Sequence, residues 1–236
     1  MIVANDTDQQ SPVSHGIQGN GIYRAGGIAA LVIVLFSLIQ IVVFVLSPPP
    51  SDVTDWFALY QRNWLVGLLD FDLLYILDNI LMIFVYLAFY VSLYRKNQAL
   101  LIVATVIGLV AIAAFFASNN AFSMLSLSRQ YAAAPTEAER AIFLAAGQTM
   151  VSLFSGTSYI VFTVLGSVAP IIISISILKY GVFSKTTAWM GIVANVLPFG
   201  LFIDQVGKYF GLLSVPFLII WFLLTALRLF KLNNAK

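Results

Sequence analysis

The 236-residue sequence has no cysteine and a single histidine, His15. Without cysteine the chain can form no disulfide, thiolate metal site, cysteine nucleophile or lipid-modified cysteine. His15 lies in a polar N-terminal segment, so the hydrophobic stretches contain no histidine. This excludes Ser-His catalysis, histidine-ligated haem and three-histidine zinc chemistry inside a membrane.

Charged residues are scarce as well. Asp, Glu, Lys and Arg make up 9% of the chain, whereas 61% of the residues are hydrophobic, and the mean hydropathy is +0.96. These values lie far outside the range of soluble domains and predict an all-α polytopic membrane protein whose main partner is the lipid bilayer. The formal net charge of +2 is scattered along the sequence, which argues against nucleic-acid binding and against a polybasic headgroup site.

Six hydrophobic stretches are long enough to be candidate crossings, since a membrane-spanning helix needs about 20 mostly apolar residues. They are 26–46, 73–94, 99–122, 156–178, 187–203 and 209–230. The sequence therefore predicts a single domain over 23–232 with six transmembrane helices in three hairpins. A polar tail (1–22) precedes this domain and a short tail (233–236) follows it.

The basic residues predict the orientation, because cytoplasmic loops carry an excess of Lys and Arg. Eight lie in the tails and in the turns after the second and fourth stretches: Arg24, Arg95, Lys96, Lys179, Lys185, Arg228, Lys231 and Lys236. The opposite side holds the other four, Arg62, Arg129, Arg140 and Lys208. Both termini are therefore predicted to be cytoplasmic.

The first outer connection carries an aromatic stripe. Trp56, Tyr60, Trp64 and Leu68 recur every four residues, which places them on one face of a short helix. Such a helix is expected to lie in the headgroup layer as an interfacial anchor, and anchoring alone is a sufficient role for it.

The connection between the third and fourth crossings predicts a helical extension outside the membrane. Thr136 and Glu139 have the spacing of a capping box, which marks a helix start well before the fourth crossing. The segment 155–158, Ser-Gly-Thr-Ser, is the expected break between this helix and the crossing. The third crossing is expected to continue past Asn120, so that the two helices form a hairpin with its tip at 129–135.

Asp78 is the most unusual residue of the hydrophobic stretches. Arg95 and Lys96 fix the inner end of the second crossing, and about 20 residues counted back from Tyr94 reach Tyr75. Asp78 is therefore expected just inside the outer edge of the hydrocarbon, where a carboxylate facing lipid is costly. It should face the other helices and be paired or protonated, although a purely structural hydrogen bond between helices is an open alternative.

Other polar residues are also expected in the outer halves of the helices, whereas the inner halves look nearly bare. This asymmetry predicts a polar cavity that opens to the outer leaflet and binds a small polar or amphiphilic ligand. The candidate ligand-binding residues are Asp78, Asn79, Asn119, Asn120, Gln148, Tyr159, Asn195 and Asp204. Possible counter-charges for the acids are Arg62, Arg129, Arg140 and Lys208.

Two further functions stay open. In the first, the protein is a membrane enzyme in which Asp70, Asp72 and Asp78 hold a divalent cation. In the second, it is a structural or assembly subunit without a pocket, whose polar residues satisfy one another. No cofactor and no catalytic residue is predicted, and small-residue pairs such as Gly207 with Gly211 leave the oligomeric state open.

Two phrases of the sequence resemble a known family. They are SNNAFSMLSLSRQYAAAPTEAERAIFLAAGQTMVSLFSGT (118–157) and ILKYGVFSKTTAWMGIVANV (177–196), and they are similar to the bacterial membrane proteins catalogued as domain of unknown function 4386. The resemblance extends over about 23–232. It implies a six-helix protein of the inner (plasma) membrane of a bacterium or archaeon, and it brings no reaction, cofactor or catalytic residue.

Overall fold

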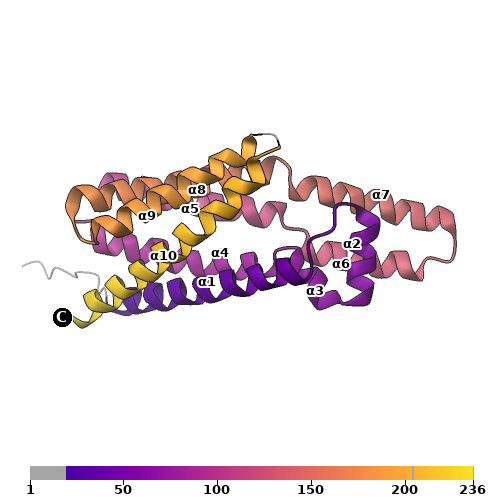
Figure 1. Cartoon of the computed structure of the whole chain (residues 1–236), viewed down its shortest axis with the longest axis horizontal. Coiled ribbons are helices and arrows are strands. Elements are labelled where there is room, and N and C mark those ends of the chain that lie inside the picture. Colours follow the sequence, from indigo (N-terminus) through magenta and orange to yellow (C-terminus); the bar gives the residue numbers. More distant parts are fainter. Residues whose placement is uncertain (1–19, 204, 236) are drawn as a thin grey trace, which may run out of the picture.

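The computed structural model describes residues 20–203 and 205–235, which form helices joined by short connections (Figure 1). The helices are α1 (Asn20–Leu46), α2 (Val53–Arg62), α3 (Trp64–Asp70), α4 (Leu73–Leu93), α5 (Gln98–Ser118), α6 (Ala121–Ala133), α7 (Glu137–Phe154), α8 (Thr157–Tyr180), α9 (Lys185–Val196), the 3₁₀ helix η1 (Leu197–Phe202) and α10 (Gly207–Asn234). Asp204, one of the candidate site residues, and most of the N-terminal tail lie outside the described residues.

The long helices form one body, here called the bundle, which consists of α1, α4, α5, α8, α9 with η1, and α10. Within it α1 packs against α4 and α10, α5 packs against α4 and α8, and α9 packs against α8 and α10. The helices thus follow one another around a closed ring. Figure 1 shows that α1 begins and α10 ends at the same end of the bundle.

The remaining helices, α2, α3, α6 and α7, form a second body at the other end, here called the head (Figure 1). Each body has its own apolar core. The bundle core includes Phe89 and Trp221, whose parallel rings lie 5.6 Å apart between centroids. The head core includes Trp56, Phe57 and Met124.

The head changes the interpretation of the aromatic stripe. Trp56 and Tyr60 are 5% and 2% exposed and pack inside the head, and the Tyr60 hydroxyl donates to the carbonyl of Ala121 at 3.1 Å. Only Trp64 faces outward, with 52% of its surface exposed. The prediction of a helix anchored in the headgroup layer by this stripe is therefore wrong for most of its residues, which fill a protein core instead.

The stripe does not follow one continuous helix either. Asn63 adopts an extended conformation that ends α2, and its side-chain oxygen accepts a hydrogen bond from the Val66 amide at 3.2 Å to start α3. Because Asn is a preferred N-cap residue, this single side chain can restart a helix in a new direction. The connection therefore folds as two short helices.

The helical extension between the third and fourth crossings is present as α6 and α7. The Thr136 hydroxyl accepts a hydrogen bond from the Glu139 amide at 3.2 Å, as its capping position predicted. The break between α7 and α8 falls at Ser155 and Gly156, also as predicted. The tip is shorter than expected, because α6 continues to Ala133 and only 134–136 form the turn.

Five helical segments among the described residues are long and apolar enough to cross a membrane. They are Gly21–Leu46, Leu73–Leu93, Gln98–Ala133, Glu137–Tyr180 and Tyr209–Asn234. An all-helical membrane protein is therefore confirmed at this level. The predicted crossing at 187–203 is not among them, because α9 gives way to η1 after Val196.

The small-residue pairs make contacts within the chain. A Cβ atom on Gly207 would lie 2.5 Å from the carbonyl oxygen of Leu201, and one on Gly211 would lie 3.2 Å from the Leu201 side chain. A Cβ atom on Gly108, on α5, would lie 2.5 Å from the ring of Tyr86 on α4. These glycines therefore allow η1 to pack on α10 and α5 to pack on α4.

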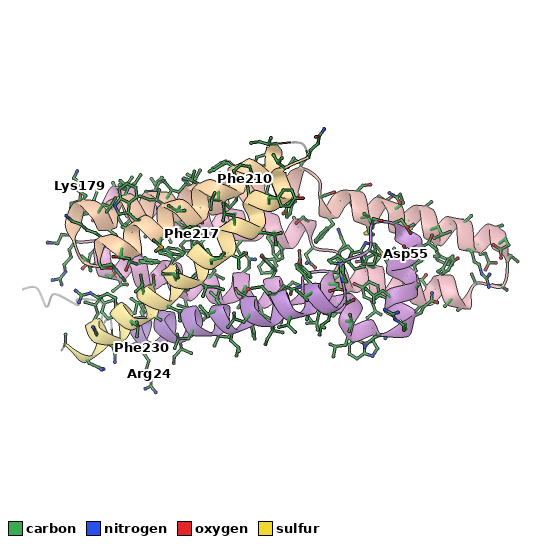
Figure 2. The ribbon with its side chains drawn as sticks, viewed as in Figure 1. Arg24, Asp55, Lys179, Phe210, Phe217 and Phe230 are labelled. Atoms are coloured by element: carbon green, nitrogen blue, oxygen red, sulfur yellow. The ribbon has the colours of Figure 1, made fainter. Side chains whose placement is uncertain are left out.

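Charge is distributed unevenly between the two ends. All acidic residues of the described part fall within 52–78 and 137–139, in or beside the head. Figure 2 shows Asp55 in the head, whereas Arg24 and Lys179 lie at the far end of the bundle. Among the described residues, the bundle end away from the head therefore has basic side chains and no acidic ones.

Candidate functional site

The three aspartates lie where the head joins the bundle. Asp70 is the last residue of α3, Asp72 directly precedes α4, and Asp78 lies within the first two turns of α4. The backbone at Asp72 is left-handed, with φ of 67°, a conformation that Asp tolerates better than most residues. Its side chain makes no capping hydrogen bond to α4.

Asp70 is enclosed by the protein, with 3% of its surface exposed. The Ser47 hydroxyl donates to Oδ2 at 3.0 Å, whereas Oδ1 is buried and has no hydrogen-bond partner within residues 20–203 and 205–235. Burial raises the pKa of the Asp70 carboxyl above its ordinary value, and the hydrogen bond from Ser47 partly opposes that shift.

Asp72 has the more strongly shifted pKa of these two residues. Loss of hydration raises the pKa of its carboxyl to about 7, and the neighbouring Asp70 carboxyl adds to the shift. Burial likewise raises the pKa of the Tyr60 hydroxyl, with smaller contributions from Asp70 and Asp72. The junction therefore disfavours negative charge and binds protons more readily than exposed carboxylates do.

Asp78 is half-buried, and its Oδ1 is enclosed without a hydrogen-bond partner in the described part of the chain. Tyr75, one turn earlier on α4, interacts electrostatically with Asp72, Asp78 and Tyr159. Tyr159, on α8, also interacts with Asp72. These four residues, Asp72, Tyr75, Asp78 and Tyr159, are here called the acidic site.

Aromatic rings connect the acidic site to the head core. Tyr159 lies 6.3 Å from Phe154, and Phe154 lies 4.6 Å from Phe71, measured between ring centroids. Phe71 in turn contacts the Trp56 ring edge-on at 4.8 Å. Since packed rings resist rearrangement, these contacts hold α8 and the end of α7 against the segment that carries the aspartates.

The predicted amides are spread along the fold. Two donate to carbonyls of their own helices: the Asn79 amide to Tyr75 at 2.9 Å, and the Asn195 amide to Gly191 at 2.7 Å. Asn119 donates to the Phe71 carbonyl at 3.4 Å and accepts from the Ala121 amide, which fixes the break between α5 and α6. These hydrogen bonds are structural.

The other predicted residues separate. Asn120 donates to the nearby Ser118 carbonyl at 2.9 Å, and Gln148 is exposed on α7. Of the eight candidate residues, the structure therefore brings Asp78 and Tyr159 together through Tyr75.

The expected counter-charges do not neutralise the aspartates. Within the described residues the ion pair is Arg140 with Glu137, at 3.0 Å on the surface of α7. Arg62 and Arg129 form no ion pair within that same part of the chain, and the Lys208 side chain is outside it. Asp72 and Asp78 thus lack a cationic partner among the described side chains.

The aspartates do not assemble as the divalent-cation hypothesis requires. Among residues 20–203 and 205–235, no three His, Cys, Asp or Glu side chains come together in a group that could hold a metal ion. Asp70, Asp72 and Asp78 are all within that range. The structure therefore gives no geometric support to a metal site at these residues.

A cavity formed by the described residues also differs from the expected one. It is a groove of about 480 Å³ between the C-terminal part of α1 and the N-terminal half of α10. Its lining is apolar and consists of Ile41, Leu212, Val215, Pro216, Ile219 and Ile220. The predicted polar residues do not line it.

The sequence analysis missed a polar cluster deep in the bundle, where the inner halves of the helices were expected to be nearly bare. Ser174 on α8 and both Trp221 and Thr225 on α10 are 0% exposed, and their polar side-chain atoms have no hydrogen-bond partner among the residues that the structure describes. The i, i+4 spacing of Trp221 and Thr225 places both on one face of α10. That spacing is the signal in the sequence, but only the packing shows that α8 contributes Ser174.

Comparisons with known proteins add no relative. No family model, curated protein or solved structure matches this chain. The resemblance to domain of unknown function 4386 therefore stays a prediction from the quoted phrases, and the function has to be argued from the geometry.

Proposed function

We propose that this integral membrane protein binds a small polar or amphiphilic ligand at the acidic site, as a sensor, carrier or accessory protein. The observation that supports this most directly is the buried, unpaired Oδ1 of Asp78, with no cationic side chain paired to Asp78 or to Asp72 in the described part of the chain. Buried polar groups without partners are rare in native proteins and call for an explanation such as a bound ligand.

The composition of the acidic site favours a ligand that carries an ammonium group. Carboxyl oxygens accept hydrogen bonds from N–H groups, and the faces of tyrosine rings attract cations. Tyr75 and Tyr159 supply such rings next to Asp72 and Asp78. An alkylammonium ion therefore suits this site better than an anion of the same length.

The proposed position in the membrane has both termini on the cytoplasmic side of the inner membrane and six crossings. The length of α9 with η1 supports the sixth crossing. Its 12 α-helical and six 3₁₀ residues extend about 30 Å, the thickness of the hydrocarbon, because a 3₁₀ helix rises about 2.0 Å per residue against about 1.5 Å in an α-helix. In this arrangement the acidic site and the head face the outer side.

A binding experiment tests the proposal. The protein is placed in nanodiscs of zwitterionic phosphatidylcholine, and binding of decylammonium is compared with binding of decyl sulfate and with empty nanodiscs. We expect saturable binding of decylammonium alone, weakened at least tenfold by Asp78→Asn. The matched control is Asp55→Asn, because Asp55 is an exposed aspartate of the head.

Equal binding by the wild type and Asp78→Asn, or binding no better than that of empty nanodiscs, would contradict the proposal. Such a result would favour the structural subunit, which the local hydrogen bonds of Asn79 and Asn195 also suit.

A further inference from the structure

Two buried oxygen atoms at the contact between α1 and α3 have no hydrogen-bond partner among the described residues. They are Oδ1 of Asp70, at the end of α3, and Oε1 of Gln40, in the C-terminal part of α1. The two side chains are 3% and 5% exposed. Leaving a buried polar atom unpaired destabilises a fold, so two such atoms at one contact point to a missing bond.

The other polar atoms of these two side chains are already in place. The Gln40 amide nitrogen donates to the Leu69 carbonyl at 3.2 Å, which fixes the amide against the residue that precedes Asp70. The Ser47 hydroxyl, just beyond the end of α1, donates to Oδ2 of Asp70 at 3.0 Å. Both unpaired oxygens therefore belong to one contact, in which Gln40 and Ser47 form hydrogen bonds with the last turn of α3.

Both unpaired atoms are acceptors when Asp70 is ionised, so they cannot pair with each other. One proton changes this, since a protonated carboxyl group becomes a donor. We propose that Asp70 is held as the neutral carboxylic acid and donates a hydrogen bond from Oδ1 to Oε1 of Gln40. The proton comes from solvent, and the bond joins the first helix of the bundle to the head.

The surroundings of Asp70 favour the neutral form. Tyr60 on α2 and Asp72 before α4 are the titratable groups that interact with it, and neither brings a positive charge. The contact face of α1 supplies Gln40 and Ser47, which do not titrate. On α6, which also packs against α3, Arg129 forms no ion pair within the described residues. Burial raises the pKa of the Asp70 carboxyl in the same direction.

A proton fits this contact better than a larger cation does. Both oxygens are enclosed by protein atoms, so a metal or ammonium ion would have to push α1 and α3 apart. Loss of the proton would leave a carboxylate oxygen facing an amide oxygen inside the protein, which is repulsive. The contact between α1 and α3 is therefore expected to loosen as pH rises. This inference needs no ligand and is independent of the proposed binding function.

Infrared spectroscopy of the full chain in nanodiscs tests the proposal. The carboxylic-acid C=O band is recorded at neutral pH for the wild type, Asp70→Asn, Gln40→Met and Asp55→Asn. We expect Asp70→Asn to remove part of the band, because an amide replaces the acid. Gln40→Met should shift that same part to higher frequency, since the acid loses its acceptor, and Asp55→Asn should leave the spectrum unchanged.

An identical acid band in the wild type and Asp70→Asn would overturn the proposal, because Asp70 would then be ionised. If Asp70→Asn does not fold, the Gln40→Met spectrum decides alone: a shifted band supports the bond, and an unshifted one overturns it. Asn at position 70 can donate to Gln40 as the acid does, so Asp70→Asn should also remove the pH dependence of hydrogen exchange in α3.

Discussion

At the scale of single residues, Asp72 couples protons to stability. Its pKa is 3.8 in its ordinary state and about 7 in the fold, so between these values the folded protein binds more protons than the unfolded chain. The protonated Asp72 carboxyl therefore stabilises the fold at low pH. This stabilisation decreases as pH rises from 3.8 to about 7, and it is absent above that range. Asp72→Asn is expected to flatten this part of the profile, as measured by thermal unfolding in detergent.

Asp55→Asn provides the comparison, because Asp55 is exposed in the head and its substitution should leave the slope unchanged. A profile for Asp72→Asn with the wild-type slope between pH 4 and pH 7 would show that Asp72 titrates in the fold as it does in a peptide.

Gly191 on α9 is a second sensitive position. A Cβ atom there would collide with Ser174 Oγ and would lie 2.6 Å from Trp221 Nε1. Gly191→Ala is therefore expected to lower the free energy of unfolding by about 1 to 3 kcal/mol, the usual cost of overpacking a core. Tryptophan fluorescence during thermal unfolding measures the change.

Gly166→Ala is the matched substitution, since a Cβ on Gly166 would meet only ordinary contacts, at 3.6 Å and beyond. There alanine should be neutral or stabilising by up to about 1 kcal/mol, because it favours the helix more than glycine does. Equal effects at the two positions would contradict the packing argument.

The sequence predicts some of these residues and misses others for a physical reason. Asp78 was expected to face the other helices because a carboxylate facing lipid is costly, and its Oδ1 is enclosed. Ser174, Trp221 and Thr225 could not be grouped, because their contact depends on how α8, α9 and α10 pack. Gln40 escaped notice for the same reason, since its partners lie 29 residues away at Leu69 and beyond.

At the scale of the elements, α2 supplies a central residue of the head core, Phe57. Phe57 is 0% exposed, its ring packs against that of Tyr131 at 5.2 Å, and its carbonyl accepts a hydrogen bond from Ser128. Phe57→Ala is expected to destabilise the head by about 3 to 5 kcal/mol. Hydrogen exchange should then rise in α2, α6 and α7, while the bundle keeps its protection.

Phe122→Ala tests whether this effect is specific, because Phe122 lies on α6 with 60% of its surface exposed. Its substitution should leave exchange in the head near the wild-type level. Comparable loosening by both variants would mean that the head has no core of its own.

Local signals explain which elements were predictable. The Thr136 cap and the break at 155–156 depend on neighbouring residues, and both were found from the sequence. Whether the aromatic stripe is buried in protein or faces lipid depends on distant helices, since a row of aromatics suits a lipid interface and a protein core equally well. Asn63 was overlooked because one capping side chain is a weak signal inside a regular repeat.

At the scale of the whole molecule, the crossing by α9 and η1 decides the topology. The chain has no cysteine, so single cysteines report without background. With six crossings, an impermeant thiol reagent should label Val206→Cys from the same side as Asp55→Cys, and Lys185→Cys from the opposite side. All three native positions are exposed. Labelling of positions 185 and 206 from one side would reduce the number of crossings to five.

The separate core of the head also constrains the order of events during synthesis. Tyr60 and Phe57 on α2 bond to partners on α6 that lie 61 and 71 residues later in the chain. At roughly 5 to 20 residues per second, the ribosome needs about 3 to 14 s to produce those partners. During that interval α4 and α5 emerge, while the apolar face of α2 is not yet covered by α6. This is the interval in which a chaperone or the insertion machinery is expected to shield α2.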